Sequence, residues 1–484
     1  MRSGHQSDEG FIGRARERAE FVALFQRKGA SLVTCLGRRR IGKSRFIAEC
    51  ARQADLFLSF SGLAPREGLG KQEQLLAFAE QLAKQTKMPR VALDSWPTAL
   101  RLLDSQLPTT GSVVVVLDEI SWMAIGDRDF AGHLKTEWDE RLSKRRGLIL
   151  VLCGSVSSWI EENILNSTGF VGRCTWQFHL KPLPLDECAA FWGTRSSRVS
   201  AAEKWRMLAV TGGVPGYLEQ VLPSKTADEN VERLCFNPSG MLFHECRRIF
   251  HDIFSRRAGA YEAIAATLAA GPRTLQEIGD ALGRERGGSL GDALRDLELA
   301  GFLRRDAFCD PLTGKTRPRE HRYRVCDPYL RFHLKYVAPN EERINKGLYQ
   351  HASFERLEAW DTIMGLQFEA LVLDSQEVLF KRLGLANRAV LNAGPYAQGK
   401  TLRREACQID FLIRTRESLY IVELKCRRVV GVDVIADVKR KIERLKLPKG
   451  QSFRAVLVHT GKLDPAVEES DYFDVIINAD EWLS

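Results

Sequence analysis

Residues 31–44, SLVTCLGRRRIGKS, join an apolar run to a glycine-rich loop. The run Ser31 to Leu36 is rich in β-branched and apolar residues and predicts a buried strand of a parallel sheet. The loop that follows fits the pattern G-x-x-x-x-G-K-S/T, which points backbone N–H groups and the positive end of a helix dipole at phosphate oxygens. We expect Lys43 to contact the β- and γ-phosphates and the Ser44 hydroxyl to bind Mg²⁺. The predicted phosphate-binding residues are Gly37, Arg38, Arg39, Arg40, Ile41, Gly42, Lys43 and Ser44.

A second motif, VVVVLDEI at residues 113–120, supports this interpretation. The apolar run at 113–117 predicts another buried strand, which places Asp118 at its carboxyl end, where a carboxylate can hold Mg²⁺. Glu119 is then in position to orient or deprotonate an attacking water. Taken alone, the loop could be an ordinary glycine-rich turn before a basic helix, and the acidic pair could be a solvated strand end. Together the two motifs predict the binding of ATP or GTP with Mg²⁺.

The surrounding sequence alternates between apolar strands and helices. Further strands are predicted at residues 56–60 and 148–153, and helices at residues 15–27, 72–84 and 96–106. Strands that are apolar throughout, separated by helices, indicate an α/β fold with a parallel sheet covered on both faces.

Two polar residues beyond the motifs are further candidates for the nucleotide site. Ser155 follows the strand at 148–153, where its side chain could sense the γ-phosphate; a simple strand-to-helix cap is the alternative. Arg173, in the predicted loop GFVGRCTW, could act as an arginine finger in cis or in trans, because a guanidinium suits the charge of a transferring phosphoryl group. A surface arginine is the alternative, and a finger in trans would require a homo-oligomer.

Composition sets the class of protein. The chain has 484 residues, enough for about three domains of the usual ~150 residues. Hydrophobic residues make up 44% and charged residues 27%, values that argue against wholesale disorder. The formal net charge of +9 favours a polyanionic partner such as DNA.

The cysteines and the N-terminus point to an intracellular protein. The 11 cysteines contain no C-x-x-C pair, and several lie in apolar runs, so we expect reduced, buried cysteines rather than disulfides or a zinc site. The N-terminal residues are polar, and no apolar run approaches the ~20 residues of a membrane span. We therefore predict a cytoplasmic protein without a membrane partner.

Several motifs occur in the order found in a known group of proteins. They are FIGRARE, GRRRIGKS, VVVVLDEI, LCGSVSSWI, VGR, LKPLPLDECAAFW and TGGVPGYLE, within about residues 10–225. Together they resemble the archaeal-type P-loop ATPases, which are STAND-like and AAA-related. The resemblance implies an ATPase core at residues 1–182 and a helical lid at 183–255, with the segment 212–215 near the nucleotide. The arginine-rich loop interior, Arg38 to Arg40, departs slightly from the pattern and affects the expected nucleotide preference.

Residues 256–340 predict a winged helix-turn-helix. Helices are expected at residues 261–268, 274–282 and 290–300, followed by a basic hairpin that ends near residue 325. The hairpin is rich in cations, which we expect to contact DNA phosphates. The alternative is packing or autoinhibition within the protein, because the third helix carries mixed charges. The hairpin cations are Arg304, Arg305, Lys315, Arg317, Arg319, Arg322 and Arg324.

Residues 341–484 carry a second candidate chemistry. Asp410 lies on one predicted strand (408–414), and Glu423 and Lys425 lie two apart on the next (419–426), so their side chains share a face. Two carboxylates can hold Mg²⁺ or Mn²⁺ against a phosphate, and the lysine can position water. The order of helix, strands (the first at 389–392), helix (434–445) and strand (455–459) resembles the PD-(D/E)XK nuclease core, a restriction-endonuclease-like α/β domain. In that resemblance Glu369 is the helical acidic residue.

These predictions combine into one functional hypothesis. The chain is expected to be a P-loop ATPase whose nucleotide state governs a DNA-directed C-terminal effector, which is a Mg²⁺- or Mn²⁺-dependent nuclease. Two alternatives remain open: an ATP-dependent DNA-binding regulator with an inactive nuclease fold, and a signalling scaffold that binds protein partners.

Overall fold

The computed structural model describes residues 10–155, 158–254, 257–283, 288–309, 315–386, 390–400, 405–445 and 450–484. The chain divides into two compact units, residues 1–181 and 182–484. The predicted segments 183–255, 256–340 and 341–484 all belong to the second unit. Among the helices that the structure describes, none is long and apolar enough to cross a membrane.

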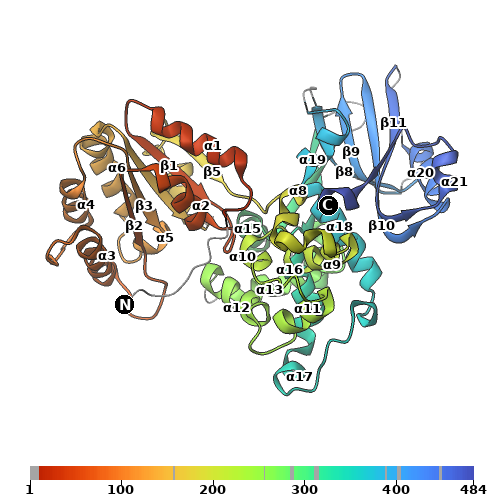
Figure 1. Cartoon of the computed structure of the whole chain (residues 1–484), viewed down its shortest axis with the longest axis horizontal. Coiled ribbons are helices and arrows are strands. Elements are labelled where there is room, and N and C mark those ends of the chain that lie inside the picture. Colours follow the sequence, from red (N-terminus) through yellow and green to blue (C-terminus); the bar gives the residue numbers. More distant parts are fainter. Residues whose placement is uncertain are drawn as a thin grey trace. The chain divides into compact units, whose positions relative to one another are not determined.

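The first unit contains a five-stranded parallel sheet with the order β2-β3-β4-β1-β5 (Figure 1). This confirms the predicted parallel α/β architecture. The order places β1, which leads into the glycine-rich loop, between β4 and β5. The strands are β1 (Ser31–Leu36), β2 (Leu56–Ser61), β3 (Val113–Asp118), β4 (Leu148–Gly154) and β5 (Cys174–His179).

Alternate residues of the strands bury apolar side chains on the two faces of this sheet. On one face, Phe21, Phe46 and Phe178 pack together, with ring centroids 5.4 to 6.0 Å apart. On the other, a chain of aromatic rings runs from Phe60 to Phe130 through two further rings. The first face is covered by α1 (Ala15–Ala23) and α2 (Lys43–Cys50), and the second by α3 (Lys71–Thr86), α4 (Trp96–Gln106) and α6 (Phe130–Glu140).

The strand β5 was not predicted from the sequence. Its burial pattern leaves one fully buried side chain, Phe178, and its remaining residues are partly or fully exposed. An edge strand of this kind lacks the continuous apolar run that identified β1, β3 and β4, so periodicity gives little signal.

The second unit begins with helices, as predicted for residues 183–255. Close backbone approach fixes the Gly-Gly-Val-Pro segment, because a Cβ on Gly213 would lie 2.2 Å from the backbone oxygen of Leu183. The helices are α8 (Leu185–Cys188), α9 (Ala201–Thr211), α10 (Pro215–Leu218), α11 (Ala227–Cys235) and α12 (Met241–Phe254).

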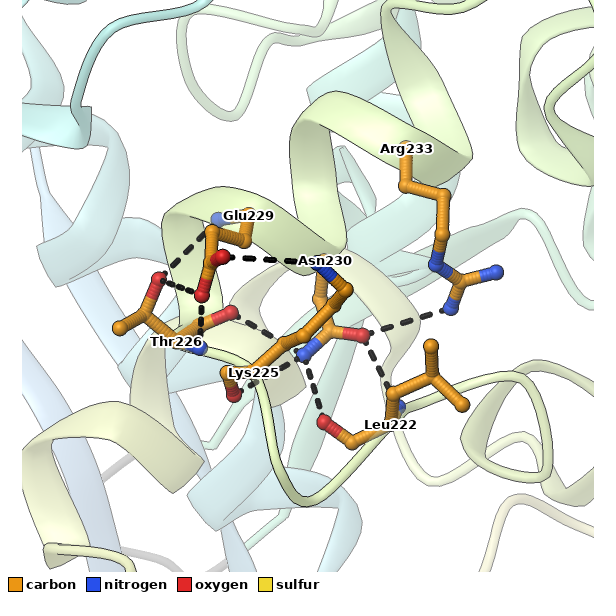
Figure 2. A network of polar contacts seen from close by, with 6 residues as sticks. All are labelled: Leu222, Lys225, Thr226, Glu229, Asn230 and Arg233. Carbon is orange, nitrogen blue, oxygen red and sulfur yellow. Dashed lines mark hydrogen bonds and ion pairs between the residues drawn. The ribbon is translucent and has the colours of Figure 1, made fainter.

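A buried asparagine folds the loop before α11 onto that helix (Figure 2). Asn230 is 1% exposed, and its amide nitrogen donates to the backbone oxygens of Leu222, Lys225 and Thr226 at 3.0 to 3.2 Å. Thr226 and Glu229 form a capping box that satisfies the first N–H groups of α11. The loop is therefore held mainly by the side chain of Asn230, a residue of α11.

Three helices and a two-stranded antiparallel hairpin follow, in the order that predicted a winged helix-turn-helix. The α14 helix begins with another capping box, between Thr274 and Glu277. The elements are α13 (Ala258–Thr267), α14 (Leu275–Ala281), α15 (Gly288–Leu299), β6 (Leu303–Cys309) and β7 (Thr316–Val325). Further helices, α16 (Pro328–Phe332), a π-helix (His333–Val337) and α17 (Glu341–Asn345), lead to the C-terminal sheet.

The C-terminal sheet is mixed, with the order β12-β11-β10-β9-β8. Strands β8, β9 and β10 are antiparallel, whereas β10, β11 and β12 are parallel. The first predicted strand begins at Ala389, which lies outside the described residues; β12 was not predicted. The elements are α18 (Trp360–Asp374), α19 (Gln376–Arg382), β8 (Val390–Gln398), β9 (Cys407–Thr415), β10 (Ser418–Val430), α20 (Asp433–Arg444), β11 (Ser452–Leu463), α21 (Pro465–Glu469) and β12 (Val475–Asn478).

Candidate functional sites

The glycine-rich loop is shaped by two glycines. Gly42 caps α2 with φ 88°, a left-handed conformation that L side chains rarely adopt. A Cβ on Gly37 would lie 2.5 Å from the backbone oxygen of Leu180. The backbone of the loop therefore takes a path that larger residues at these two positions would disrupt.

Lys43 lies against the inside of this loop. The residue is 7% exposed, and its Nζ donates to the backbone oxygens of Gly37 at 3.0 Å and Arg38 at 3.2 Å. A buried ammonium that is satisfied by neutral carbonyls keeps its full charge for an anionic ligand. The loop and its lysine therefore fit a polyphosphate.

The predicted Mg²⁺ ligands from the two motifs are in direct contact. The Ser44 hydroxyl donates to Oδ2 of Asp118 at 2.7 Å, and Oδ1 of Asp118 accepts the backbone N–H of Glu119 at 3.0 Å. A hydroxyl and a carboxylate are oxygen ligands of the kind that Mg²⁺ prefers. The residues present thus fit a nucleotide-bound Mg²⁺, which would offset charge on the phosphates.

Glu119 and Ser155 meet beside this pair. Ser155 follows β4, which lies between β3 and β1 in the sheet. The carboxyl ends of these parallel strands are neighbours, so Ser155 lies close to Glu119. The backbone N–H of Ser155 donates to the Glu119 carboxylate. Burial raises the pKa of Glu119, while Lys43 opposes this effect and Asp118 adds to it. A carboxylate with a raised pKa is a better proton acceptor from water.

Sequence reasoning missed Arg14 as a support of the loop. Arg14 is 4% exposed, and its Nη2 donates to the backbone oxygens of Ile41 at 3.0 Å and Lys181 at 2.9 Å. It has a left-handed conformation, with φ 56°, immediately before α1. The residue lies in the FIGRARE motif, but its target is a backbone oxygen 27 residues away, which sequence patterns do not reveal.

Arg173 lies at the amino-terminal end of the parallel strands, whereas the loop lies at their carboxyl-terminal end. It immediately precedes β5, whose amino end pairs with the amino end of β1, whereas the loop follows the carboxyl end of β1. Its guanidinium makes two hydrogen bonds with the Asp139 carboxylate, at 2.6 and 2.8 Å. The structure does not bring Arg173 to the phosphate site of its own chain, so the prediction of a finger in cis finds no support here.

The C-terminal sheet brings together the predicted acidic residues of β9 and β10. Asp410 Oδ2 accepts the backbone N–H of Leu424 at 2.9 Å, which places Asp410 beside Glu423. Glu423 is 1% exposed, and its Oε1 lies 2.7 Å from Nζ of Lys425. Burial and the charge of Glu423 raise the pKa of Asp410, which Lys441 partly offsets. A buried and a half-buried carboxylate placed together in this way fit a divalent cation.

Lys441 of α20 was missed from the sequence. Its Nζ lies 2.5 Å from Oε2 of Glu423 and 3.5 Å from Oδ1 of Asp410. Helical spacing could have indicated that Lys441 faces the sheet, because it lies on the same face of α20 as the buried Val434 and Val438. The ammonium stands where a divalent cation would meet both carboxylates.

Glu369 of α18 interacts with both the hairpin and the carboxylate cluster, since its charge raises the pKa of Asp410 and it also pairs with Arg324. Its Oε1 lies 3.4 Å from Nη1 of Arg324, and burial raises its pKa, which the charge of Arg331 opposes. Arg324 is 3% exposed and also pairs with Asp306 at 2.7 Å. Arg304 pairs with Asp306 and Asp374.

These ion pairs favour the alternative prediction for Arg304 and Arg324, packing within the protein rather than contact with DNA phosphates. The acidic partners of these two arginines lie on β6 (Asp306) and on α18 (Glu369 and Asp374). Arg305 and Lys315 are exposed and Arg322 is half-buried. Arg317 and Arg319 lie on β7, but their side chains are outside the described residues.

Comparison with solved structures finds proteins of similar fold. A Walker-type ATPase of Pyrococcus abyssi has a TM-score of 0.50 and 17% identity, over 68% of this chain and 97% of that one. This chain therefore shares a fold with that protein. The ORC2 protein of Aeropyrum pernix, solved as ADPNP-ADP complexes, has a TM-score of 0.40 and 15% identity, over 70% of this chain and 97% of that one.

A sequence relative covers a similar share of the chain. An uncharacterized protein of Methanocaldococcus jannaschii is 22% identical over 364 residues, which are 74% of this chain and 75% of that protein. The chain matches no protein-family model.

Proposed function

We propose that the protein is an ATP-hydrolysing switch whose nucleotide state governs a DNA-directed effector in its C-terminal part. The contact of Ser44 with Asp118, beside the buried Lys43, carries this proposal. Bound Mg²⁺ and Lys43 would neutralise the phosphates, and Glu119 would orient and deprotonate the attacking water. Arg173 would act on the nucleotide of a second copy, because it lies far from the site of its own chain.

The effector is proposed to combine a winged helix-turn-helix with a PD-(D/E)XK nuclease-like domain. The support is the closeness of Asp410, Glu423 and Lys425 on neighbouring strands. In this proposal Asp410 and Glu423 hold Mg²⁺ or Mn²⁺, and Lys425 positions the water that attacks a DNA phosphodiester. Glu369 would contribute charge from α18.

A second candidate function is favoured by Lys441. Its ammonium already pairs with both carboxylates and occupies the place of a cation, so the domain would bind DNA without cutting it. The protein would then be an ATP-dependent DNA-binding regulator with an inactive nuclease fold. The predicted signalling scaffold has no specific contact in its favour.

Plasmid DNA incubated with the full chain, Mg²⁺ or Mn²⁺, and ATP separates these functions. Cleavage that Asp410→Ala abolishes, with ATP hydrolysis kept, supports the nuclease. A mobility shift without cleavage supports the regulator. Lys43→Ala, compared with the exposed control Lys84→Ala, tests the ATPase in the same samples: equal turnover by Lys43→Ala and the control would remove the switch proposal altogether.

A further inference from the structure

Three side chains with metal-binding atoms meet in the helical part of the second unit, and none of them belongs to either site described above. They are Cys246 of α12, Glu262 of α13 and His333, the first residue of the π-helix that continues α16. Their thiol, carboxylate and imidazole ligand atoms lie within 4.8 Å of one another. Because zinc bonds to sulfur, nitrogen and oxygen measure about 2.0 to 2.3 Å, small side-chain rotations would bring these atoms into tetrahedral positions.

The surroundings leave one ligand atom without a partner. His333 is 7% exposed, and its Nδ1 has no hydrogen-bond partner among the described residues. Buried polar atoms are nearly always satisfied, and leaving one unsatisfied costs about 1 to 3 kcal/mol. A metal ion bound at the imidazole would remove this cost.

The backbone around the Cys246 thiol is held by hydrogen bonds to Tyr329, which lies in the same segment as His333. Tyr329, four residues before His333, accepts the backbone N–H of Cys246 at 2.8 Å and donates to the backbone oxygen of Leu242 at 2.6 Å. Cys246 is 1% exposed, whereas Glu262 is half-buried and leaves a route for the ion from solvent. Such outer contacts hold ligands in place before the metal binds.

We propose that Cys246, Glu262 and His333 bind one zinc ion, with a water in the fourth position. A thiolate, an imidazole and a carboxylate suit zinc, whereas Mg²⁺ and Ca²⁺ prefer oxygen ligands alone. A thiolate and a carboxylate also balance the two charges of the ion in this buried place. The site would join α12, α13 and the helix after α16, three elements that the chain separates by up to 87 residues.

Metal content and Co²⁺ substitution of the full chain test this site. We expect about one zinc per chain, and a thiolate-to-Co²⁺ charge-transfer band when Co²⁺ replaces zinc. Cys246→Ser should abolish the band, while the buried control Cys188→Ser should keep it. A wild-type chain with neither stoichiometric zinc nor the band would overturn the proposal, and so would a band that persists in a folded Cys246→Ser variant.

A measurement on the wild-type chain covers the case in which the variants do not fold. Mass spectrometry would follow alkylation of Cys246 with zinc present and after chelation, with Cys188 as the internal reference. Zinc should slow alkylation of Cys246 at least tenfold relative to Cys188. Equal alkylation rates in both conditions would contradict zinc binding at this thiol.

Discussion

Replacing Lys441 with methionine removes the ammonium that Asp410 and Glu423 share while keeping most of the side-chain volume. The Nζ of Lys441 lies 3.5 Å from Asp410 and 2.5 Å from Glu423. Removing one partner of a buried ion pair costs about 3 to 5 kcal/mol. Glu423 keeps Lys425 at 2.7 Å, so we expect the lower value, about 3 kcal/mol. Since 1.4 kcal/mol is a factor of ten, local opening of β9 and β10 should become about 100-fold more frequent.

Hydrogen exchange of peptides from residues 407–426 measures this opening in the full chain. Mn²⁺ should slow exchange again in the Lys441→Met variant, because a divalent cation can replace the lost ammonium between the carboxylates. Lys439→Met is the matched control, since Lys439 is an exposed lysine of the same helix. Unchanged exchange in the Lys441→Met variant would refute the ion-pair reasoning. Faster exchange that Mn²⁺ leaves unaltered would show that these carboxylates do not form a metal site.

The remaining predictions concern the nucleotide site and the hairpin. Glu119→Gln should keep ATP bound but slow hydrolysis by about 10² to 10⁴, measured by phosphate release; collapse of affinity would instead make Glu119 a structural residue. Because burial raises the pKa of Glu119, wild-type hydrolysis should fall with decreasing pH at a higher pH than an ordinary glutamate would give, and a fall at the ordinary position would contradict this role. If the finger acts between copies, the Arg173→Ala variant by itself should not hydrolyse ATP, and mixing it with the Glu119→Gln variant should restore hydrolysis. Mixed oligomers without restored hydrolysis would argue against a finger in trans. Replacing Arg317, Arg319 and Arg322 with alanine should weaken DNA binding and reduce its salt slope by about one unit per phosphate contact, and an unchanged slope would mean that the hairpin faces protein.

The predictable features were those encoded in neighbouring residues. Continuous apolar runs identified β1, β3 and β4. The loop motif and the VVVVLDEI motif predicted Ser44 and Asp118 at one Mg²⁺ site, and the two side chains are in contact. By contrast, β5 has one fully buried side chain and gave no such run. Local patterns are informative where burial affects every residue of a strand, and weak at the edge of a sheet.

The missed residues act over long separations in the chain. Arg14 reaches the backbone of Ile41, and Lys441 lies beside a carboxylate 18 residues earlier. Arg324 looked like a phosphate ligand because the sequence displays its charge but not the carboxylates that neutralise it. Only tertiary contacts distinguish a cation that faces solvent from one that is buried in an ion pair.

The contact of Arg324 with Glu369 makes the hairpin and the carboxylate cluster energetically interdependent. Glu369 raises the pKa of Asp410 through its negative charge, and Arg324 partly neutralises that charge. Pulling the hairpin away would remove the positive charge that offsets Glu369 and so increase the attraction of the cluster for cations. By reciprocity, a cation at the cluster would change the free energy of hairpin release by the same amount. A force or ligand that acts on β7 would therefore change the cation affinity of the carboxylate cluster on β9 and β10.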